Sequence, residues 1–145
     1  MKTHKLISTF VIAAFALTPQ FTSSIRAAGN GYSAKLISPR LGQVLYPGQH
    51  VRIQWEATFP DLKNVHLCEM EIWLSLDGGR TFPHCITPVI NPRVNYYDWI
   101  VPDTPTNAAV LDIRFGCELY YPESYSPQPQ ATFVIARSAP VPVPL

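Results

Sequence analysis

After residue 29 the hydrophobic positions of the chain alternate with polar ones in short runs, which are separated by Gly, Pro, Asn and Asp. In the run 50–56, Val51, Ile53 and Trp55 fall on one side of an extended chain and the polar residues between them fall on the other. The same period recurs over 67–76 and over 111–118. A period of two residues is typical of antiparallel strands that have one face in a core.

Further strands are expected where β-branched and aromatic residues lie between turn-forming residues, at 32–38, 43–46, 81–90, 95–101 and 131–136. No helical periodicity extends beyond two turns. Seven or eight strands in about a hundred residues are typical of immunoglobulin-like domains. The pattern therefore predicts an all-β fold, namely an antiparallel immunoglobulin- or fibronectin-III-like β-sandwich.

The first 28 residues have the order of regions found in a secretory signal peptide. Lys2 and Lys5 precede an apolar run over 6–17, and small residues follow near position 28. The run is shorter than the ~20 residues that a membrane-spanning helix needs, so we expect no membrane span after its removal. The mature chain should then be secreted, in the periplasm or outside the cell.

Three segments are expected on this basis: a signal peptide at 1–28, the sandwich at 29–136 and an extended tail at 137–145, where proline occupies every second position over 140–144. The mature part has 117 of the 145 residues, which is the size of one domain. Three of the 11 basic residues lie in the leader, which leaves 8 against 10 acidic ones. This balance argues against a nucleic-acid partner and against a polybasic membrane-binding role.

The chain has three cysteines, Cys68, Cys85 and Cys117, which allow three different pairings. In the predicted sandwich the strand 67–76 lies antiparallel to the strand 111–118, and their inward residues match in order. The matched pairs are Met70 with Phe115, Ile72 with Ile113, and Leu74 with Leu111. One step further along, the same register brings Cys68 opposite Cys117, at a separation suited to a disulfide.

A bridge between Cys68 and Cys117 would close 48 intervening residues and stabilise the fold by roughly 4 kcal/mol on the chain-entropy model. Cys85 would then be left over, either buried or free to link two chains as a homodimer.

An alternative function is the binding of copper. Thiolate, imidazole and thioether ligands are available at His66, Cys68, Met70 and His84. The ligand order of a cupredoxin loop is absent, however, and core packing accounts for Met70. No cofactor is therefore expected. No hydrolase, phosphate-binding or CxxC motif occurs, and Glu69 and Glu71 should point to solvent, so no catalytic residue is assigned.

The loops 58–64, 88–94 and 119–130 should converge at one pole of the sandwich. This pole would carry the aromatic and basic residues that bind a ligand. The candidates are Phe59, Lys63, Arg93, Tyr120, Tyr121 and Tyr125. Alternatively, the tyrosines pack back on the domain. Trp73, on an outward strand face, is a second candidate contact.

Four short motifs occur in order along the chain: Pro39-x-x-Gly42, Ile53-x-Trp55, Asp77-Gly78-Gly79 and Trp99-x-Val101-Pro102. Together they resemble the secreted Ig-like domain of the yeast cell-wall-synthesis type and its bacterial relatives. The resemblance implies a non-catalytic module of an exported protein. The expected function is therefore binding or structural, with a protein or a polysaccharide at the cell surface as the partner.

Overall fold

The computed structural model describes residues 31–60, 63, 65–117 and 121–138. The predicted signal peptide and residues 139–145 of the predicted tail lie outside the described residues. Nine strands and one 3-10 turn, η1 (Val65–Leu67), occur in the described ranges. The strands are β1 (Ser33–Ser38), β2 (Val44–Leu45), β3 (His50–Thr58), β4 (Glu69–Ser75), β5 (His84–Cys85), β6 (Tyr96–Ile100), β7 (Thr106–Cys117), β8 (Tyr121–Ser124) and β9 (Phe133–Ile135). The described part of the chain holds no helix with both the length and the apolar character to cross a bilayer.

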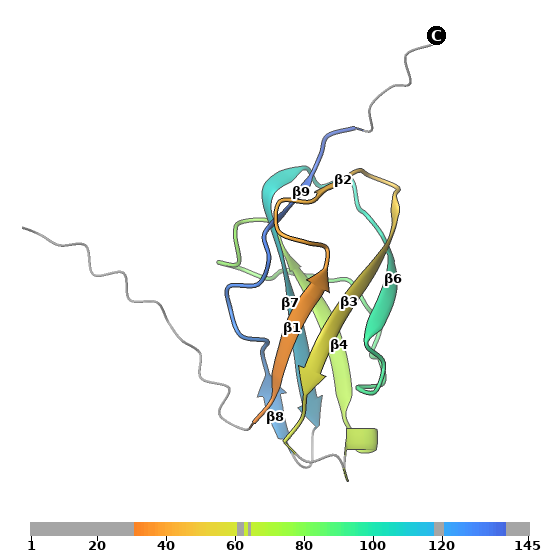
Figure 1. The fold of residues 1–145 in the computed structure, drawn as a ribbon, viewed down its shortest axis with the longest axis vertical. Helices are drawn as coiled ribbons and strands as arrows, with labels where there is room; N and C mark the ends of the chain where they lie inside the picture. The colour runs from red at the N-terminus through yellow and green to blue at the C-terminus, as the bar shows by residue number, and fades with distance from the viewer. Residues whose placement is uncertain (1–30, 61–62, 64, 118–120, 139–145) are drawn as a thin grey trace, which may run out of the picture.

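The strands form two sheets that pack face to face, with β1 and β3 in front of β4 and β7 in Figure 1. One sheet has the order β1-β3-β6, and the other has the order β2-β9-β7-β4-β5, with β8 paired to the end of β7. The predicted all-β, immunoglobulin-like sandwich is confirmed. One detail differs, because β2 pairs with β9 in parallel whereas the other pairs of named strands are antiparallel.

The inward residues of the alternating runs form the core, as the pattern predicts. On β3 the buried positions are Val51, Ile53 and Trp55, and the residues between them are exposed. Tyr32 stacks on Phe115 with 5.1 Å between ring centres, and its hydroxyl donates to the carbonyl of Ile113 at 2.8 Å. Aromatic and aliphatic side chains of both sheets thus meet in one continuous cluster, which excludes water from the space between the sheets.

The register between β4 and β7 agrees with the prediction. Met70 lies opposite Phe115, Ile72 opposite Ile113, and Leu74 opposite Leu111. The last pair of this ladder joins Glu69 and Gly116, one step from Cys68 and Cys117. The side-chain period fixes this register, since a slip of one residue would turn the core set of a strand out to solvent.

Two predicted elements were wrong in their extent. The run 81–90 was expected to be one strand, but β5 covers two of its residues, and Ile90 adds a single bridge to Met70. Pro83 and Pro88 lack the amide donors that a longer ladder would need. The run 119–130 was expected to be a loop, but β8 lies within it and pairs with β7.

The turn after β4 is held by the side chains of Ser75 and Asp77. Gly78 and Gly79 both have positive φ, which explains the glycine pair. The Asp77 carboxylate accepts bonds from the amides of Arg80 and Thr81 at 3.0 and 2.9 Å, and from the Thr81 hydroxyl at 2.8 Å. These bonds, led by the one from the Thr81 amide, together with the Ser75 hydroxyl, hold the pKa of Asp77 well below its ordinary value.

We expect Asp77→Asn to lower the melting temperature at pH 7, and the difference from the wild type to shrink in acid. Because the folded-state pKa is lowered, the carboxylate contributes stability above its unfolded pKa of about 3.9, and this contribution is lost as the pH falls towards the folded value. Thermal unfolding followed from pH 7 to pH 2 measures both effects. Asp103→Asn, at an exposed position, is the control, and a pH-independent difference for Asp77→Asn would contradict this account.

Candidate functional site

A cleft of about 420 Å³ opens on the flank of the sandwich where β5 ends one sheet and β6 ends the other. We call it the flank cleft. Its apolar wall comes from both sheets and from the segment after β6. This wall consists of Leu74, Ile86, Trp99, Ile100 and Pro102. Ligand sites in proteins are typically concave and mostly apolar and have volumes of 300–1,000 Å³, so the flank cleft has the size and lining of a binding site.

Four polar side chains complete the lining of the flank cleft, and they are His84, Tyr97, Asp98 and Thr104. The Thr104 hydroxyl is buried and finds no hydrogen-bond partner among the described residues. A buried hydroxyl without a partner is uncommon, and here it stands in the wall of a cleft. These groups could therefore orient a ligand that the apolar wall holds.

Asp98 is committed to an ion pair with Arg52 on the neighbouring strand. The guanidinium donates to both carboxylate oxygens, from Nε at 2.8 Å and from Nη2 at 3.0 Å. This pairing, first through the hydrogen bonds and then through the charge of Arg52, keeps the pKa of Asp98 below its ordinary value. Both side chains are more than half exposed, so the pair contributes little to stability, but it compensates the charge on this lip of the flank cleft.

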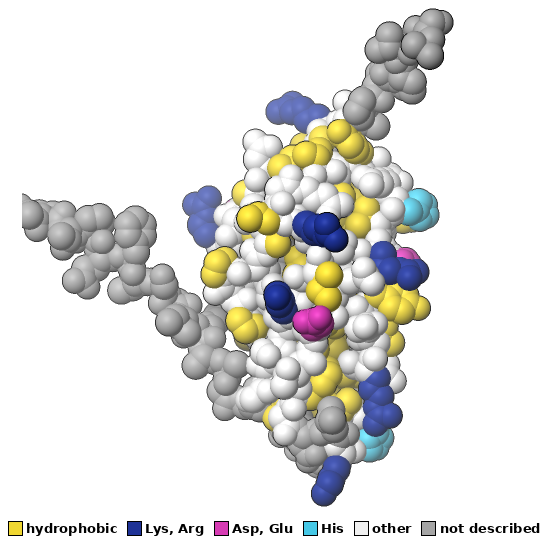
Figure 2. Space-filling model, viewed as in Figure 1, with side chains coloured by type: hydrophobic (Ala, Val, Ile, Leu, Met, Phe, Trp, Pro, Cys, Tyr) yellow, Lys and Arg dark blue, Asp and Glu magenta, His cyan; other side chains and the backbone are white. Residues whose placement is uncertain are grey.

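The outer face of the β1-β3-β6 sheet has no dominant charge. Figure 2 shows basic, acidic and apolar side chains interspersed over β1 and β3. Arg52 also lies over the ring of Tyr96, 4.3 Å from its centre. This face therefore lacks the single-sign patch that a polyanionic partner would need.

On the outer face of the other sheet, Arg114 is enclosed by aromatic rings. Its guanidinium lies 4.4 Å from the centre of Trp73 and 4.7 Å from the centre of Tyr125. Its Nε donates to buried Asp112 at 3.0 Å, and its Nη1 lies 3.4 Å from Glu123. We call these five residues the arginine cluster. The cluster fastens the segment after β8 to β7, so its aromatic faces already serve the fold.

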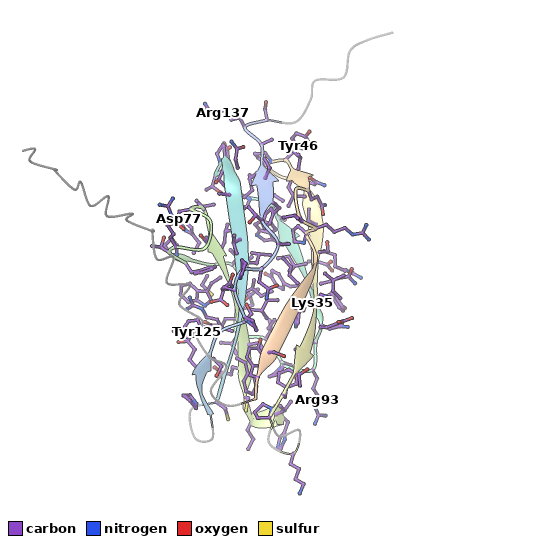
Figure 3. All side chains as sticks on the ribbon, turned by 60° about the vertical axis from the view of Figure 1, so that its left-hand side comes forward. Lys35, Tyr46, Asp77, Arg93, Tyr125 and Arg137 are labelled. Carbon is purple, nitrogen blue, oxygen red and sulfur yellow. The ribbon has the colours of Figure 1, made fainter. Side chains whose placement is uncertain are left out.

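The residues of the predicted binding pole are only partly described, and their role as one ligand site stays a prediction. Phe59 is half buried and packs against Tyr32 and Phe115, with 5.1 Å between the ring centres of Phe59 and Phe115, so part of its ring already serves the core. Tyr125 belongs to the arginine cluster instead. Figure 3 shows Arg93 at the lower end of the molecule and Tyr125 on the side.

The other pole residues are accounted for as follows. Lys63 and Arg93 are exposed, Tyr120 lies outside the described residues, and Tyr121 begins β8. The tyrosines were predicted to lie in a loop over 119–130, and β8 forms part of that segment.

The alternative copper ligands are not brought together, so that prediction was wrong. His66 is exposed on η1, Cys68 and Met70 point into the core, and His84 pairs with Leu74 at the far end of β4. Leu74 and Cys68 are separated by about 20 Å of strand. The described residues contain no group of three or more His, Cys, Asp or Glu side chains that could hold a metal ion.

The thiols of Cys68 and Cys117 are buried side by side, and the thiol of Cys85 is exposed. Burial, followed by a hydrogen bond from the Cys68 thiol to the Cys117 sulfur, raises the pKa of Cys68 to about 12. The thiol of Cys85 donates to the Thr87 carbonyl at 3.3 Å and lies opposite Trp73 in the ladder. The Cys68–Cys117 disulfide and the homodimer through Cys85 both stay predictions.

Sequence reasoning did not group the residues of the flank cleft as one site. His84 and Ile86 were part of one long predicted strand, and Thr104 was unremarkable between prolines. One available signal was the alternation of 95–101, where Tyr97 and Trp99 point inward beside a short neighbouring strand. Comparison with known proteins gave no match, whether to a protein family, to a curated protein or to a solved structure.

Proposed function

We propose that the chain is an exported, non-catalytic immunoglobulin-like binding module that acts at the cell surface or outside the cell, and that the flank cleft is its ligand site. The observation that carries this proposal is the cleft itself. It has about 420 Å³, apolar walls from both sheets and a buried hydroxyl without a partner in its wall.

The chemistry of the flank cleft supports binding without catalysis. Asp98 is its acidic group, and both of its carboxylate oxygens accept bonds from Arg52. A carboxylate held in this way is a poor general base, because its lowered pKa weakens its affinity for a proton. The remaining lining offers hydrophobic contact and neutral hydrogen-bonding groups, which suit recognition.

Export and location rest on the leader and on the family resemblance. The order of charged, apolar and small residues over 1–28 supports secretion. The motif residues have structural roles that suit the proposed relationship to the Ig-like domain of the yeast cell-wall-synthesis type. Gly42 and Gly78 adopt positive φ, while Trp55 and Trp99 pack in the core. The partner on this proposal is a protein or a polysaccharide of the cell surface.

Ile100→Glu should weaken partner binding at least about tenfold, because it places a charge on the apolar lip of the flank cleft. Ile100 is 58% exposed, so the variant should fold normally. Val89→Glu is the matched control, since Val89 is 52% exposed and lies outside the cleft lining. Binding of the purified mature protein to intact cells and to extracted wall polysaccharide is measured for all three proteins. Equal binding by wild type and Ile100→Glu would remove the cleft from the proposal.

A further inference from the structure

The backbone groups of β6 divide into two sets, one bonded to β3 and one facing away from the sheet. The Trp55 amide donates to the Asn95 carbonyl at 3.1 Å, and the Val101 amide donates to the Gln49 carbonyl at 3.0 Å. In an antiparallel ladder the bonded pairs alternate, so the odd positions Tyr97 and Trp99 also bond to β3. The amides and carbonyls of the even positions therefore point outward.

Three consecutive even positions, Tyr96, Asp98 and Ile100, thus present unpaired donors and acceptors along the free edge of β6, at the right of the front sheet in Figure 1. No hydrogen bond from a described residue reaches these backbone groups. The flank cleft begins directly beside this edge, because Tyr97 to Ile100 form its wall.

The opposite edge of the same sheet is treated differently. There the side-chain amide of Gln130 acts as a substitute strand for β1. Its Nε2 donates to the Ala34 carbonyl at 2.8 Å, and its Oε1 accepts from the Leu36 amide at 3.0 Å. Natural sheets usually cover or charge their edges, since an open edge recruits other strands. In this sheet β1 is covered and β6 is left open.

We infer that the open edge of β6 is a docking site for an extended polypeptide segment of another protein, which adds to the sheet as a further strand. The inference rests on the proposed function and assigns the partner of the same cleft. A strand paired through Tyr96, Asp98 and Ile100 would send alternate side chains into the flank cleft, towards Leu74, Ile86 and Trp99. Main-chain bonds supply affinity, and the apolar wall selects the side chains.

Charge defines the segment further. The side-chain charge of the edge, on Asp98, is compensated by Arg52, so no net field favours a charged peptide. The complementary segment is uncharged, with aliphatic or aromatic residues at the alternate positions that enter the cleft.

A second copy of this chain fits the edge less well than a peptide. The edge of five residues is about 17 Å long, which is a short seam for joining two folded copies, since a stable interface buries roughly 1,200 Å². Two-fold pairing centred on β6 would also bring the two Arg52–Asp98 ion pairs against each other. A peptide avoids both costs and fills the cleft as well.

The test uses the mature full chain and a phage-displayed library of linear twelve-residue peptides. Selection should enrich uncharged peptides with alternating apolar residues. When a selected peptide is added, amide hydrogen exchange of Tyr96, Asp98 and Ile100 should slow at least about tenfold, while the amides of Tyr97 and Trp99, already bonded to β3, should change little. N-methylation of the peptide at one alternate set of amides should abolish binding, and methylation of the other set should not.

Ile100→Pro removes one edge amide that is not used by β3, and it should weaken peptide binding at least about tenfold, whereas Val89→Glu, outside the cleft lining, should bind like the wild type. If Ile100→Pro does not fold, the N-methylated peptides still test whether backbone hydrogen bonds hold the peptide. Three results would overturn strand addition: no enrichment over the Ile100→Glu protein, peptide binding without slowing at the three edge amides, or protection of these amides by a homodimer. If any of these three results is found, the proposed function is still supported as long as Ile100→Glu loses binding to cells or to wall polysaccharide.

Discussion

Asp112→Ala should lower the free energy of unfolding by about 3 to 5 kcal/mol, because it removes the buried partner of a largely buried guanidinium and leaves only the exposed Glu123 carboxylate at 3.4 Å. The Asp112 side chain is 2% exposed and that of Arg114 is 14% exposed. One carboxylate oxygen of Asp112 also accepts from the amide and the hydroxyl of Ser126, at 3.0 and 2.8 Å. The substitution therefore leaves these two buried donors without their acceptor as well. Urea unfolding of the purified mature protein measures the loss.

The matched control is Asp98→Ala, which removes the carboxylate from an exposed ion pair of similar geometry. Since water replaces the lost partner there, its unfolding curve should stay close to that of the wild type. Asp112→Asn should fall between the two aspartate-to-alanine variants, because an amide oxygen can still accept from Ser126. A loss below about 1 kcal/mol for Asp112→Ala would show that the arginine cluster contributes far less than its burial implies.

Reduction of the mature protein should lower its free energy of unfolding by about 4 kcal/mol, if the Cys68–Cys117 disulfide forms on export. The two thiols lie together at the end of the β4–β7 ladder, and both are 5% exposed. Burial raises the pKa of Cys68 to about 12, which disfavours its thiolate in the packed state. The Cys85→Ser protein, unfolded in urea with and without dithiothreitol, measures the difference without exchange from the third thiol.

Thiol counting provides the independent check. Alkylation of the unfolded but unreduced wild type should modify Cys85 alone, and prior reduction should raise the count to all three cysteines. Modification of three cysteines without reduction would contradict the predicted bridge.

Alternation was enough to place the inward apolar sets of β3, β4 and β7 in the core, and it also aligned β4 with β7. Both follow from the side-chain period of a strand, which is a local property of the sequence. Met70 and Phe115 lie opposite each other because each of their strands has one apolar face, and this face has to be buried.

Asp112 shows where the same reasoning fails. Its polar side chain alternates with apolar ones, which predicted a solvent-facing position, yet it is buried. The segment around Ser126 folds back over this part of β7 and supplies its hydrogen bonds. This contact joins residues 14 apart that belong to no common pattern.

The flank cleft was unpredictable for a related reason. It depends on how far β5 extends and on which strand ends the facing sheet, and both are properties of the assembled fold. Loop residues such as Phe59 and Tyr125 have packing partners that the sequence pattern did not identify, because only the tertiary structure brings these partners to them.

The side chain of Gln130 has a consequence for assembly. It bonds to the Ala34 carbonyl and the Leu36 amide on the β1 edge. The β1-β3-β6 sheet can therefore accept an added strand at the β6 edge but not at these two groups of β1. A molecule that accepts a strand on one side cannot offer the other side to the next molecule, so growth ends after a single step. A sheet with one covered edge therefore resists stepwise strand addition, whereas a sheet open on both sides can seed fibres.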